Sequence, residues 1–299
     1  MQTFRLIRRL PHIPRRAVRE LLRYIQVARL TWINLYGTSR VTSSCGPVVS
    51  LTTFGRRSRR VNLAIESIAC GRWRPSRLIL WIDEEALHSN LPPALRRLEQ
   101  RGLEIHSCKN YGPHKKYYPY VESQESFDAP LVTADDDVLY PSYWLKELVR
   151  ANENYPDSVN CYLAHVIALK CDGIEEYRAW KSCDSILPDF RHVAVGLAGV
   201  IYPPSFLTVL KRAGSSFGTC CPKGDDLWLH AQALRSGYKV RQIFPRLPYF
   251  SFQGIPGTAE TALSHENVTH GDGNDRQIRA TYNESDLRLL RFESGIAYH

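Results

Sequence analysis

The chain lacks any run close to the roughly 20 apolar residues that a membrane-spanning helix needs. Its N-terminus has no signal-peptide pattern either, because arginines interrupt each short apolar segment and no small-residue cleavage site follows one. None of the eight cysteines forms a CxxC pair, and no Cys/His cluster has the spacing of a zinc site. We therefore expect a cytoplasmic protein with reduced cysteines, although their even number leaves disulfides open.

Acidic residues are scarce at the N-terminal end. Residues 1–40 contain nine arginines and a single acid, Glu20, which gives this segment a charge of +8. The whole chain carries +9, so the remaining 259 residues carry only +1. This asymmetry indicates an anionic partner for the N-terminal segment, either a membrane or a nucleic acid.

The remaining composition is that of a folded protein. Hydrophobic residues make up 43% of the chain and charged residues 23%, which excludes a disordered polypeptide. A length of 299 residues fits two small domains or one large α/β domain.

Residues 14–36 predict one amphipathic helix, which Gly37 ends. Its apolar face comprises Val18, Leu21, Leu22, Ile25, Ala28, Trp32, Leu35 and Tyr36, and its polar face comprises Arg15, Arg16, Arg19, Arg23 and Gln26. Val27 and Leu30 depart from this pattern. Two interpretations stand. The helix lies in an anionic membrane interface, which would make the protein peripheral at the inner face of the cell membrane, or it packs on the rest of the protein with its arginines in solvent.

From residue 47 onward, short apolar runs alternate with helical patterns. Strands are predicted at 48–54, 78–82, 103–107 and 130–134, and helices at 58–71, 92–101 and 141–154. Further strands are predicted at 159–169, 193–202 and 238–244, helices at 203–212 and 225–236, and a loop at 251–275. This alternation predicts an α/β fold with a mostly parallel central sheet and flanking helices. Ligands in such sheets bind beyond the carboxyl ends of the strands.

Three adjacent carboxylates, Asp135, Asp136 and Asp137, follow the strand at 130–134. Adjacent carboxylates repel one another, and a fold tolerates them when a cation lies among them. Oxygen ligands select Mg²⁺ or Mn²⁺, which typically also coordinate substrate phosphates. A solvated acidic turn is the alternative, and the preceding buried strand favours the metal site.

Two further motifs carry charged groups. Asp225 and Asp226 begin the predicted helix at 225–236, where the helix dipole stabilises an acid. This placement explains one aspartate well, and a pair suggests that one of them serves as a general base. Lys115 and Lys116 follow a Gly-Pro turn, where they would either meet a diphosphate or simply face solvent.

In their order and spacing these segments resemble bacterial GT-A glycosyltransferases related to family 2, of the type found among capsule and lipopolysaccharide assembly enzymes. The resemblance covers about residues 48–275. It rests on Val-Ser-Leu-Thr-Thr-Phe at 49–54 with Arg56 and Arg57, Leu-Trp-Ile-Asp at 80–83, Gly-Pro-His-Lys-Lys at 112–116, Thr-Ala-Asp-Asp-Asp-Val-Leu-Tyr-Pro at 133–141, Gly-Val-Ile-Tyr-Pro-Pro at 199–204, Asp-Asp-Leu-Trp at 225–228 and Asn274-Asp275.

Residues 1–44, the expected basic N-terminal helix and tail, lie outside the resemblance. For the rest of the chain, the resemblance implies one GT-A domain at 45–299 with a donor half at 45–140 and an acceptor half at 141–299. It implies transfer of a sugar from a nucleotide-sugar, most commonly a UDP-sugar, to a hydroxyl of a glycan or lipid-linked acceptor in cell-surface polysaccharide or glycolipid assembly. The expected cofactor is Mn²⁺ or Mg²⁺ and the expected mechanism inverting, with retention left open.

The resemblance also implies residue roles. Thr52 and Thr53 would line the nucleotide pocket, Asp83 would bind the base, Lys115 or Lys116 would approach the diphosphate, Asp135 and Asp136 would face the ribose or donor sugar, Asp137 with Asp135 would bind the metal, and Asp226 would be the base with Asp225 beside it. The family's usual pair at the last position is Glu-Asp, whereas this chain has Asp-Asp.

A few residues and functions stay open from the sequence. His265 and His270 are candidate metal contacts, with exposed loop positions favoured, and Tyr177 and Trp180 either line the acceptor site or pack in the core. A nucleotidyltransferase is disfavoured, because the first loop has a single glycine where such enzymes are Gly-rich. A nucleic-acid-binding protein is disfavoured by the nearly neutral body, and we expect no nucleic acid partner. The intact aspartate motifs argue against a degenerate, inactive transferase.

Overall fold

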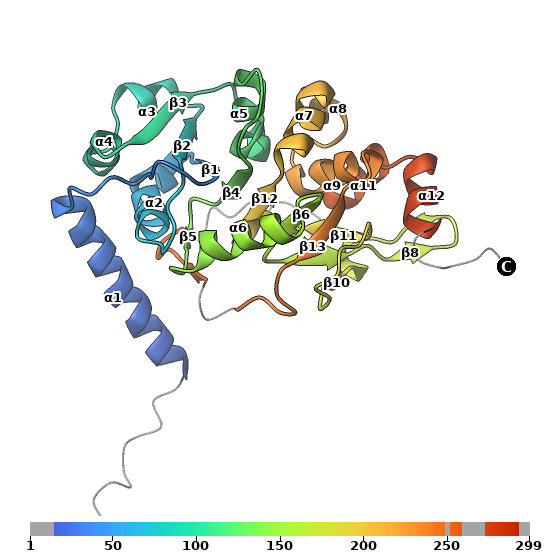
Figure 1. The fold of residues 1–299 in the computed structure, drawn as a ribbon, viewed down its shortest axis with the longest axis horizontal. Coiled ribbons are helices and arrows are strands. Elements are labelled where there is room, and N and C mark those ends of the chain that lie inside the picture. Colours follow the sequence, from blue (N-terminus) through green and yellow to red (C-terminus); the bar gives the residue numbers. More distant parts are fainter. Residues whose placement is uncertain (1–14, 249–251, 259–272, 293–299) are drawn as a thin grey trace, which may run out of the picture.

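Seven strands form a central sheet in which all but one run parallel (Figure 1). The structure is a computed structural model and describes residues 15–248, 252–258 and 273–292. The strands follow the order β13 (Lys239–Gln242), β6 (Ser158–Cys161), β12 (Val200–Tyr202), β4 (Leu131–Ala134), β1 (Val48–Thr52), β2 (Arg77–Ile82) and β3 (Leu103–Ser107). Strand β12 is antiparallel to both β4 and β6. The predicted α/β fold with a mostly parallel central sheet and flanking helices is confirmed.

Helices cover both faces of the sheet, because apolar side chains alternate between the two faces along the strands. On β1, Val48 belongs to one hydrophobic cluster, whereas Val49 and Leu51 belong to the other. The first cluster includes residues of α5 (Tyr118–Ser123), α7 (Pro204–Ala213) and α9 (Asp225–Arg235), and the second includes residues of α2 (Val61–Ala69), α4 (Pro93–Gln100) and α6 (Trp144–Asn154). Because helices cover both faces of the sheet, a ligand-binding site is expected at the ends of the strands.

Shorter elements connect these layers. The 3-10 helices are η1 (Gly55–Arg59), η2 (Gly112–Lys116), η3 (Tyr177–Ala179) and η4 (Gly196–Ala198), and the other helices of the body are α3 (Glu85–Ser89), α8 (Phe217–Cys220), α11 (Gly273–Thr281) and α12 (Glu284–Phe292). The small sheets contain β5 (Val138–Leu139), β7 (Ala164–Val166), β8 (Leu169–Lys170), β9 (Gly173–Ile174), β10 (Lys181–Ser182), β11 (His192–Ala194) and β14 (Gln253–Gly254).

The structure corrects three predicted elements. The strand at 159–169 is divided into β6, β7 and β8, because the chain leaves the central sheet after β6 and pairs with β11 instead. The strand at 193–202 is interrupted by η4, after which Gly199 adopts a positive φ of 97°. The loop at 251–275 contains β14, and its last residues already belong to α11. His265 and His270 lie outside the described residues.

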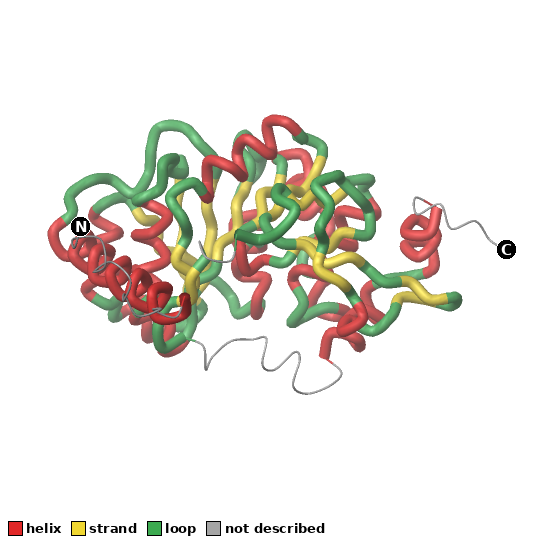
Figure 2. Tube along the Cα trace, turned by 90° about the horizontal axis from the view of Figure 1, so that it is seen from below, coloured by secondary structure: helices red, strands yellow, loops and turns green. Residues whose placement is uncertain are grey.

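Helix α1 (Arg15–Tyr36) projects from one end of the body, and α12 lies at the opposite end (Figures 1 and 2). Helix α1 contacts α2 and α4. Leu30 is buried in a cluster with Leu63 and Ala64, and Val27 packs against the same cluster. The two residues that depart from the amphipathic pattern therefore help to attach the helix to the body. The buried Asn34 does so as well, because its amide donates to Glu66 and to the Ala94 carbonyl oxygen.

The apolar face of α1 is exposed to solvent. Leu21 and Trp32 have exposed fractions of 61% and 62%, whereas Arg19 and Arg23 on the polar face are half-buried. This orientation is the reverse of a helix that packs through its apolar face with its arginines in solvent. The polar side of α1 is turned toward the body, and its apolar side is available for a partner.

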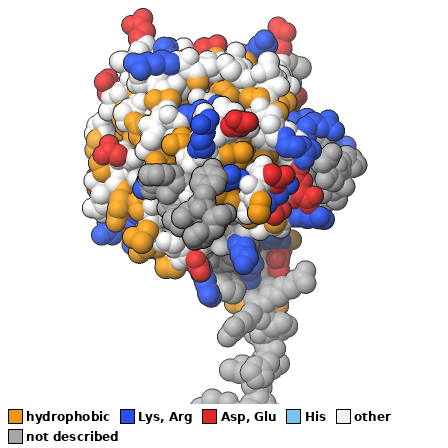
Figure 3. Space-filling view, turned by 90° about the vertical axis from the view of Figure 1, so that its right-hand side faces the viewer, with side chains coloured by type: hydrophobic (Ala, Val, Ile, Leu, Met, Phe, Trp, Pro, Cys, Tyr) orange, Lys and Arg blue, Asp and Glu red, His pale blue; other side chains and the backbone are white. Residues whose placement is uncertain are grey.

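The remaining bulk features agree with the composition. All eight cysteines lie within the described residues and are free thiols. Within the described ranges, no helix combines the length and the hydropathy that crossing a bilayer requires. On the face of the molecule shown in Figure 3, acidic and basic side chains intermingle among hydrophobic ones, as expected for a body with little net charge.

Candidate active site

The carboxyl ends of β1, β2 and β4 meet at one edge of the central sheet. Strand β1 pairs in parallel register with β2 on one side and β4 on the other, so the chain leaves all three strands in the same direction. Thr53 directly follows β1, Asp83 directly follows β2 and Asp135 directly follows β4. The polar residues predicted from the sequence therefore share the edge at which such sheets bind ligands.

Two carboxylates of the triplet are held by one arginine. The Arg57 guanidinium lies 2.8 Å from Asp136 Oδ1 and 2.9 Å from Asp137 Oδ2. The Thr53 hydroxyl donates a 2.7 Å hydrogen bond to Asp136. Thr53, Arg57 and Asp136 are buried, whereas Asp137 is partly exposed. Asp136 is thus a fixed internal anchor, whereas Asp137 remains the accessible member of this group.

Lys116 joins the triplet to the start of α9. Its Nζ lies 2.5 Å from Asp135 Oδ1 and 3.9 Å from Asp225 Oδ2. Burial alone would lower the pKa of Lys116. The charges of Asp135, Asp225 and Asp226 outweigh this effect and raise that pKa well above its ordinary value. Two acidic motifs that are far apart in the sequence therefore converge on one fixed ammonium group.

Asp226 is a half-buried carboxylate with an unusual proton affinity. The backbone N–H of Gly196 donates to both carboxylate oxygens, at 3.2 Å and 3.3 Å. Burial and the adjacent charge of Asp225 raise the pKa of Asp226 to about 8, against the opposing charge of Lys116 and the Gly196 hydrogen bond. A carboxyl group that titrates near neutral pH is suited to general base catalysis.

The turn that carries the two lysines is fixed to the loop before α9. The buried imidazole of His114 contacts the Cys221 carbonyl oxygen at 2.7 Å and the Tyr117 hydroxyl at 2.9 Å, and it stacks on Phe217. Gly112 adopts a positive φ of 58°, and an added Cβ would lie 3.0 Å from the Pro222 carbonyl oxygen. Because of these contacts, Lys116 and the start of α9 keep a fixed relative position.

A second buried ion pair lies at the end of β2. Lys115 Nζ is 2.6 Å from Asp83 Oδ2, and both side chains are nearly inaccessible. Asp83 Oδ1 is buried and has no hydrogen-bond partner among the described residues. A buried acceptor without a partner requires an explanation, and a ligand N–H group would provide one.

The threonines after β1 use their hydroxyls inside the protein. The Thr52 hydroxyl donates to the Trp81 carbonyl oxygen at 3.0 Å, and Thr53 is bonded to Asp136 as described above. Both side chains are buried. They support the site, and direct contact with a nucleotide stays a prediction for both.

The triplet offers a partial donor set for a divalent cation. Among the described residues, no group of three or more His, Cys, Asp or Glu side chains is arranged to hold a metal ion. Burial and the charge of Asp135 raise the pKa of Asp137 to about 6, although the ion pair with Arg57 opposes this shift. Mg²⁺ and Mn²⁺ commonly use one or two carboxylates and complete their coordination with substrate phosphates. Asp135 and Asp137 fit this mode of binding.

Sequence reasoning missed two functional contacts. Arg57 stands in a segment with several arginines, so its pattern gave no sign that it binds two members of the triplet. Gly196 lies so close to Asp226 that an added Cβ would be 3.3 Å from its Oδ1. In the sequence, Gly196 is marked only by its position, with Gly199, between two short apolar runs.

Of the two aromatic residues considered for the acceptor site, Trp180 is buried in the core and Tyr177 is half-buried. Burial and the charge of Asp226 raise the pKa of Tyr177 to about 12. The ring centroids of Tyr177 and Trp180 are 5.0 Å apart, and Trp180 belongs to a core cluster. Trp180 is therefore placed for packing, and the role of Tyr177 at the acceptor site stays a prediction.

Comparisons with known proteins give only distant likenesses. No family model and no curated protein sequence matches the chain. Among solved structures, it is similar to the mannosyltransferase PcManGT from Pyrobaculum calidifontis in complex with GDP-Man and Mn²⁺, with 11% identity and a TM-score of 0.49 over 93% of this chain and 78% of that chain. It is also similar to residues 1–349 of S. aureus TarS, with 9% identity and a TM-score of 0.42 over 82% of this chain and 69% of that chain. At these values, neither likeness bears on activity.

Proposed function

We propose that the chain is a GT-A-type glycosyltransferase that moves a sugar from a nucleotide-sugar to an acceptor hydroxyl. The single observation that supports this most strongly is the bridge by Lys116 between Asp135 at the end of β4 and Asp225 at the start of α9. This bridge brings the aspartate triplet, at which we propose that the diphosphate binds, next to Asp226, a carboxylate with a raised pKa. Sugar transfer needs both groups close together, because one binds the donor diphosphate while the other removes the proton of the acceptor.

The donor half, residues 45–140, would bind the nucleotide-sugar, and the acceptor half, residues 141–299, would bind the acceptor. The unpaired Oδ1 of Asp83 would accept a hydrogen bond from the nucleotide base. Thr52, Thr53, Lys115, Lys116, Asp135 and Asp136 would form the rest of the donor site. We expect a UDP-sugar as donor and a glycan or lipid-linked acceptor in cell-surface polysaccharide or glycolipid assembly.

In this mechanism Asp226 removes the proton of the acceptor hydroxyl as that oxygen attacks the anomeric carbon, with inversion. Gly196 orients the carboxylate through its N–H group, and Asp225 stands beside it toward the acceptor. Lys116 would lie near the departing diphosphate, on which negative charge develops, and a fixed cation in such a position lowers the barrier. When bound by Asp135 and Asp137, Mn²⁺ or Mg²⁺ would supply further Lewis-acid stabilisation of that charge.

The proposal is tested by incubating the full chain with a panel of UDP-sugars and GDP-sugars and Mn²⁺, and measuring free UDP or GDP. We expect slow release of the diphosphate from at least one donor even with water as acceptor. The alternative reaction is tested with nucleoside triphosphates and sugar 1-phosphates. Pyrophosphate release in that assay, without UDP or GDP release in the first, would identify a nucleotidyltransferase instead.

We also propose that α1 binds the surface of an anionic membrane. Its exposed apolar face would enter the interface, and its cationic N-terminal segment would meet the lipid headgroups. This would make the protein peripheral at the inner face of the cell membrane.

Flotation with vesicles of phosphatidylcholine and phosphatidylglycerol tests this role. The chain is expected to float, and Leu21→Gln/Ile25→Gln/Trp32→Gln is expected to reduce binding at least about a hundredfold, because each lost side chain forfeits roughly 1.5–3 kcal/mol of burial. Leu289→Gln, on an exposed leucine of α12, is the matched control and should bind normally. Failure of the unmodified chain to float, or equal loss in the control, would contradict the proposal.

A further inference from the structure

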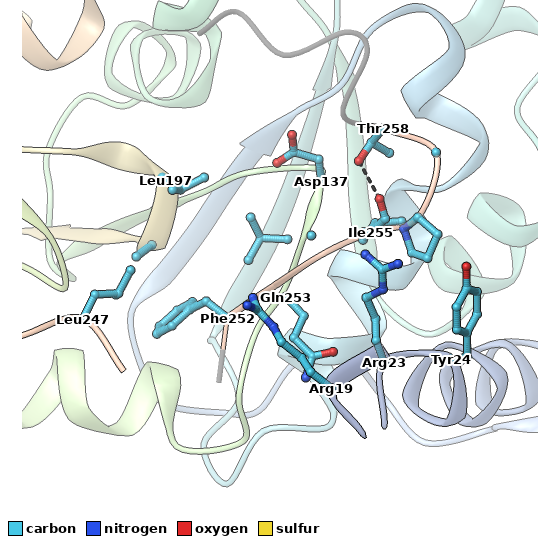
Figure 4. Close-up of a pocket in the computed structure, with 15 residues that line it drawn as sticks. Arg19, Arg23, Tyr24, Asp137, Leu197, Leu247, Phe252, Gln253, Ile255 and Thr258 are labelled. Carbon is cyan, nitrogen blue, oxygen red and sulfur yellow. Dashed lines mark hydrogen bonds between the residues drawn. The ribbon is translucent and has the colours of Figure 1, made fainter. Parts of the chain in front are cut away.

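The cavity beside the triplet is separate from the start of α9. It has a volume of about 460 Å³, lies between α1 and the segment 252–258, and includes Asp137 in its lining (Figure 4). Within the described part of the chain, neither Lys116 nor any residue of α9 lines it. A ligand confined to this cavity would therefore contact the triplet without fixing the position of Lys116 relative to α9. The protein itself has to set that position.

His114 joins the turn of the two lysines to the loop before α9. It lies in η2, two residues before Lys116, and its side chain is fully buried. The imidazole Nε2 is 2.7 Å from the Cys221 carbonyl oxygen, and the ring stacks on Phe217 with 3.9 Å between the centroids and 9° between the planes. His114 belongs to the proposed donor half, whereas Phe217 and Cys221 belong to the proposed acceptor half.

The same contacts define the protonation state of this imidazole. A carbonyl oxygen can only accept, so Nε2 carries a proton and donates it to Cys221. Nδ1 lies 2.9 Å from the Tyr117 hydroxyl. Burial raises the pKa of Tyr117 well above its ordinary value, so this hydroxyl keeps its proton and donates to Nδ1. Burial also lowers the pKa of His114, which favours the neutral ring with both nitrogens hydrogen-bonded.

We infer that His114 is a positioning residue of the proposed transfer reaction and holds Lys116 beside the two aspartates of α9. The inference rests on the proposed transferase function and assigns a role to the histidine of the Gly-Pro-His-Lys-Lys segment. The ion pair of Lys116 with Asp135 is direct, at 2.5 Å. The distance of 3.9 Å from Lys116 to Asp225, by contrast, depends on how the turn lies against the loop before α9. His114 fixes that contact without touching the substrate.

Diphosphate release by the full chain over a range of pH tests the inference, with the UDP-sugar or GDP-sugar that reacts fastest in the panel. His114→Phe keeps a ring but removes both hydrogen bonds. It should lower kcat about tenfold to a hundredfold, because small misplacements of reacting groups have effects of that order. The rising limb of kcat/KM should also move to higher pH, because the charge of Lys116 lowers the pKa of Asp226 and would lie farther away. His114→Gln keeps an N–H donor for Cys221, so its loss and its shift should be smaller.

His192→Phe is the matched control. The buried imidazole of His192 contacts the Val240 carbonyl oxygen at 3.2 Å and Cys183 Sγ at 3.4 Å, so both of these contacts lie within the acceptor half. This variant should melt at a lower temperature without moving the pH limb. Phe217→Leu removes the stacked ring but neither hydrogen bond. It should move the limb in the same direction as His114→Phe but by less, and it keeps the test available if His114→Phe does not fold.

Three results would overturn the inference: an unmoved limb in both His114→Phe and Phe217→Leu, an equal shift in His192→Phe, or a His114→Gln variant as impaired as His114→Phe. Each of them, obtained while the unmodified chain releases diphosphate, refutes the positioning role and leaves the transferase standing. Absence of diphosphate release by the unmodified chain with every donor of the panel refutes the transferase, and the inference with it.

Discussion

Asp226→Asn is expected to lower kcat about 10³-fold while raising the melting temperature by about 5 °C. The amide keeps the shape of the carboxylate and still accepts the Gly196 hydrogen bond, but it cannot take a proton from the acceptor. It also removes a charge whose ionisation burial and Asp225 oppose. Asp157→Asn, on an exposed aspartate, is the control and should change neither quantity.

The contribution of Asp226 to stability and its contribution to activity depend on pH in opposite ways. Its folded-state pKa of about 8 lies above the ordinary 3.8, so the folded protein binds this proton more tightly than the unfolded chain does. The stabilising contribution of the group is therefore complete below pH 3.8 and is lost as the pH rises to about 8. The gain in melting temperature of Asp226→Asn should grow over that range, whereas kcat/KM of the unmodified chain should rise toward pH 8. If kcat/KM of Asp226→Asn still rises with pH in the same way, Asp226 is not the base.

Lys116→Met is expected to destabilise the fold by about 3 kcal/mol, because it leaves Asp135 and Asp225 without their shared cation. Lys170→Met is the matched control. Lys170 pairs with Asp172 at 3.9 Å, but both side chains are largely exposed, so the expected change is below about 0.5 kcal/mol.

A double-mutant cycle distinguishes the ion pair from simple packing. Lys116→Met/Asp135→Asn should recover part of the lost stability in urea denaturation, because the stranded charge is removed with its partner. The double variant should nevertheless remain inactive in the diphosphate release assay. If the two single effects simply add, the contact between Lys116 and Asp135 carries no coupling and the bridge is not what holds the two motifs together.

The sheet and the strand-end residues could be predicted from the sequence because their signals are local. The buried runs that form β1, β2 and β4 are bounded by polar residues, and Asp83 and Asp135 follow directly. Parallel strands bring such ends together without any further information. By contrast, the interruption of the strand predicted at 193–202 depends on packing: an added Cβ on Gly199 would lie 2.6 Å from the Trp144 ring.

The contacts inside the site could not be predicted, because they join distant segments. The run at 55–60 contains four arginines, and only the folded chain shows that Arg57 is the buried one. The sequence is equally compatible with a solvated Lys116, because its two partners lie directly after β4 and at the start of α9. The amphipathic pattern of α1 was compatible with either orientation, and the contacts of Leu30 and Asn34 with the body fix the observed one.

Calorimetric titration of UDP and GDP, with and without Mn²⁺, on the unmodified chain and on Asp137→Ala tests the central claim most directly. We predict that one nucleotide binds in the presence of the metal, that binding weakens sharply without it, and that Asp137→Ala abolishes the metal-dependent part while Asp157→Ala does not. Thermal melting of each variant controls for folding. Absence of binding by either nucleotide with Mn²⁺ present, or unchanged metal-dependent binding in Asp137→Ala, would contradict a donor site at the ends of β1, β2 and β4.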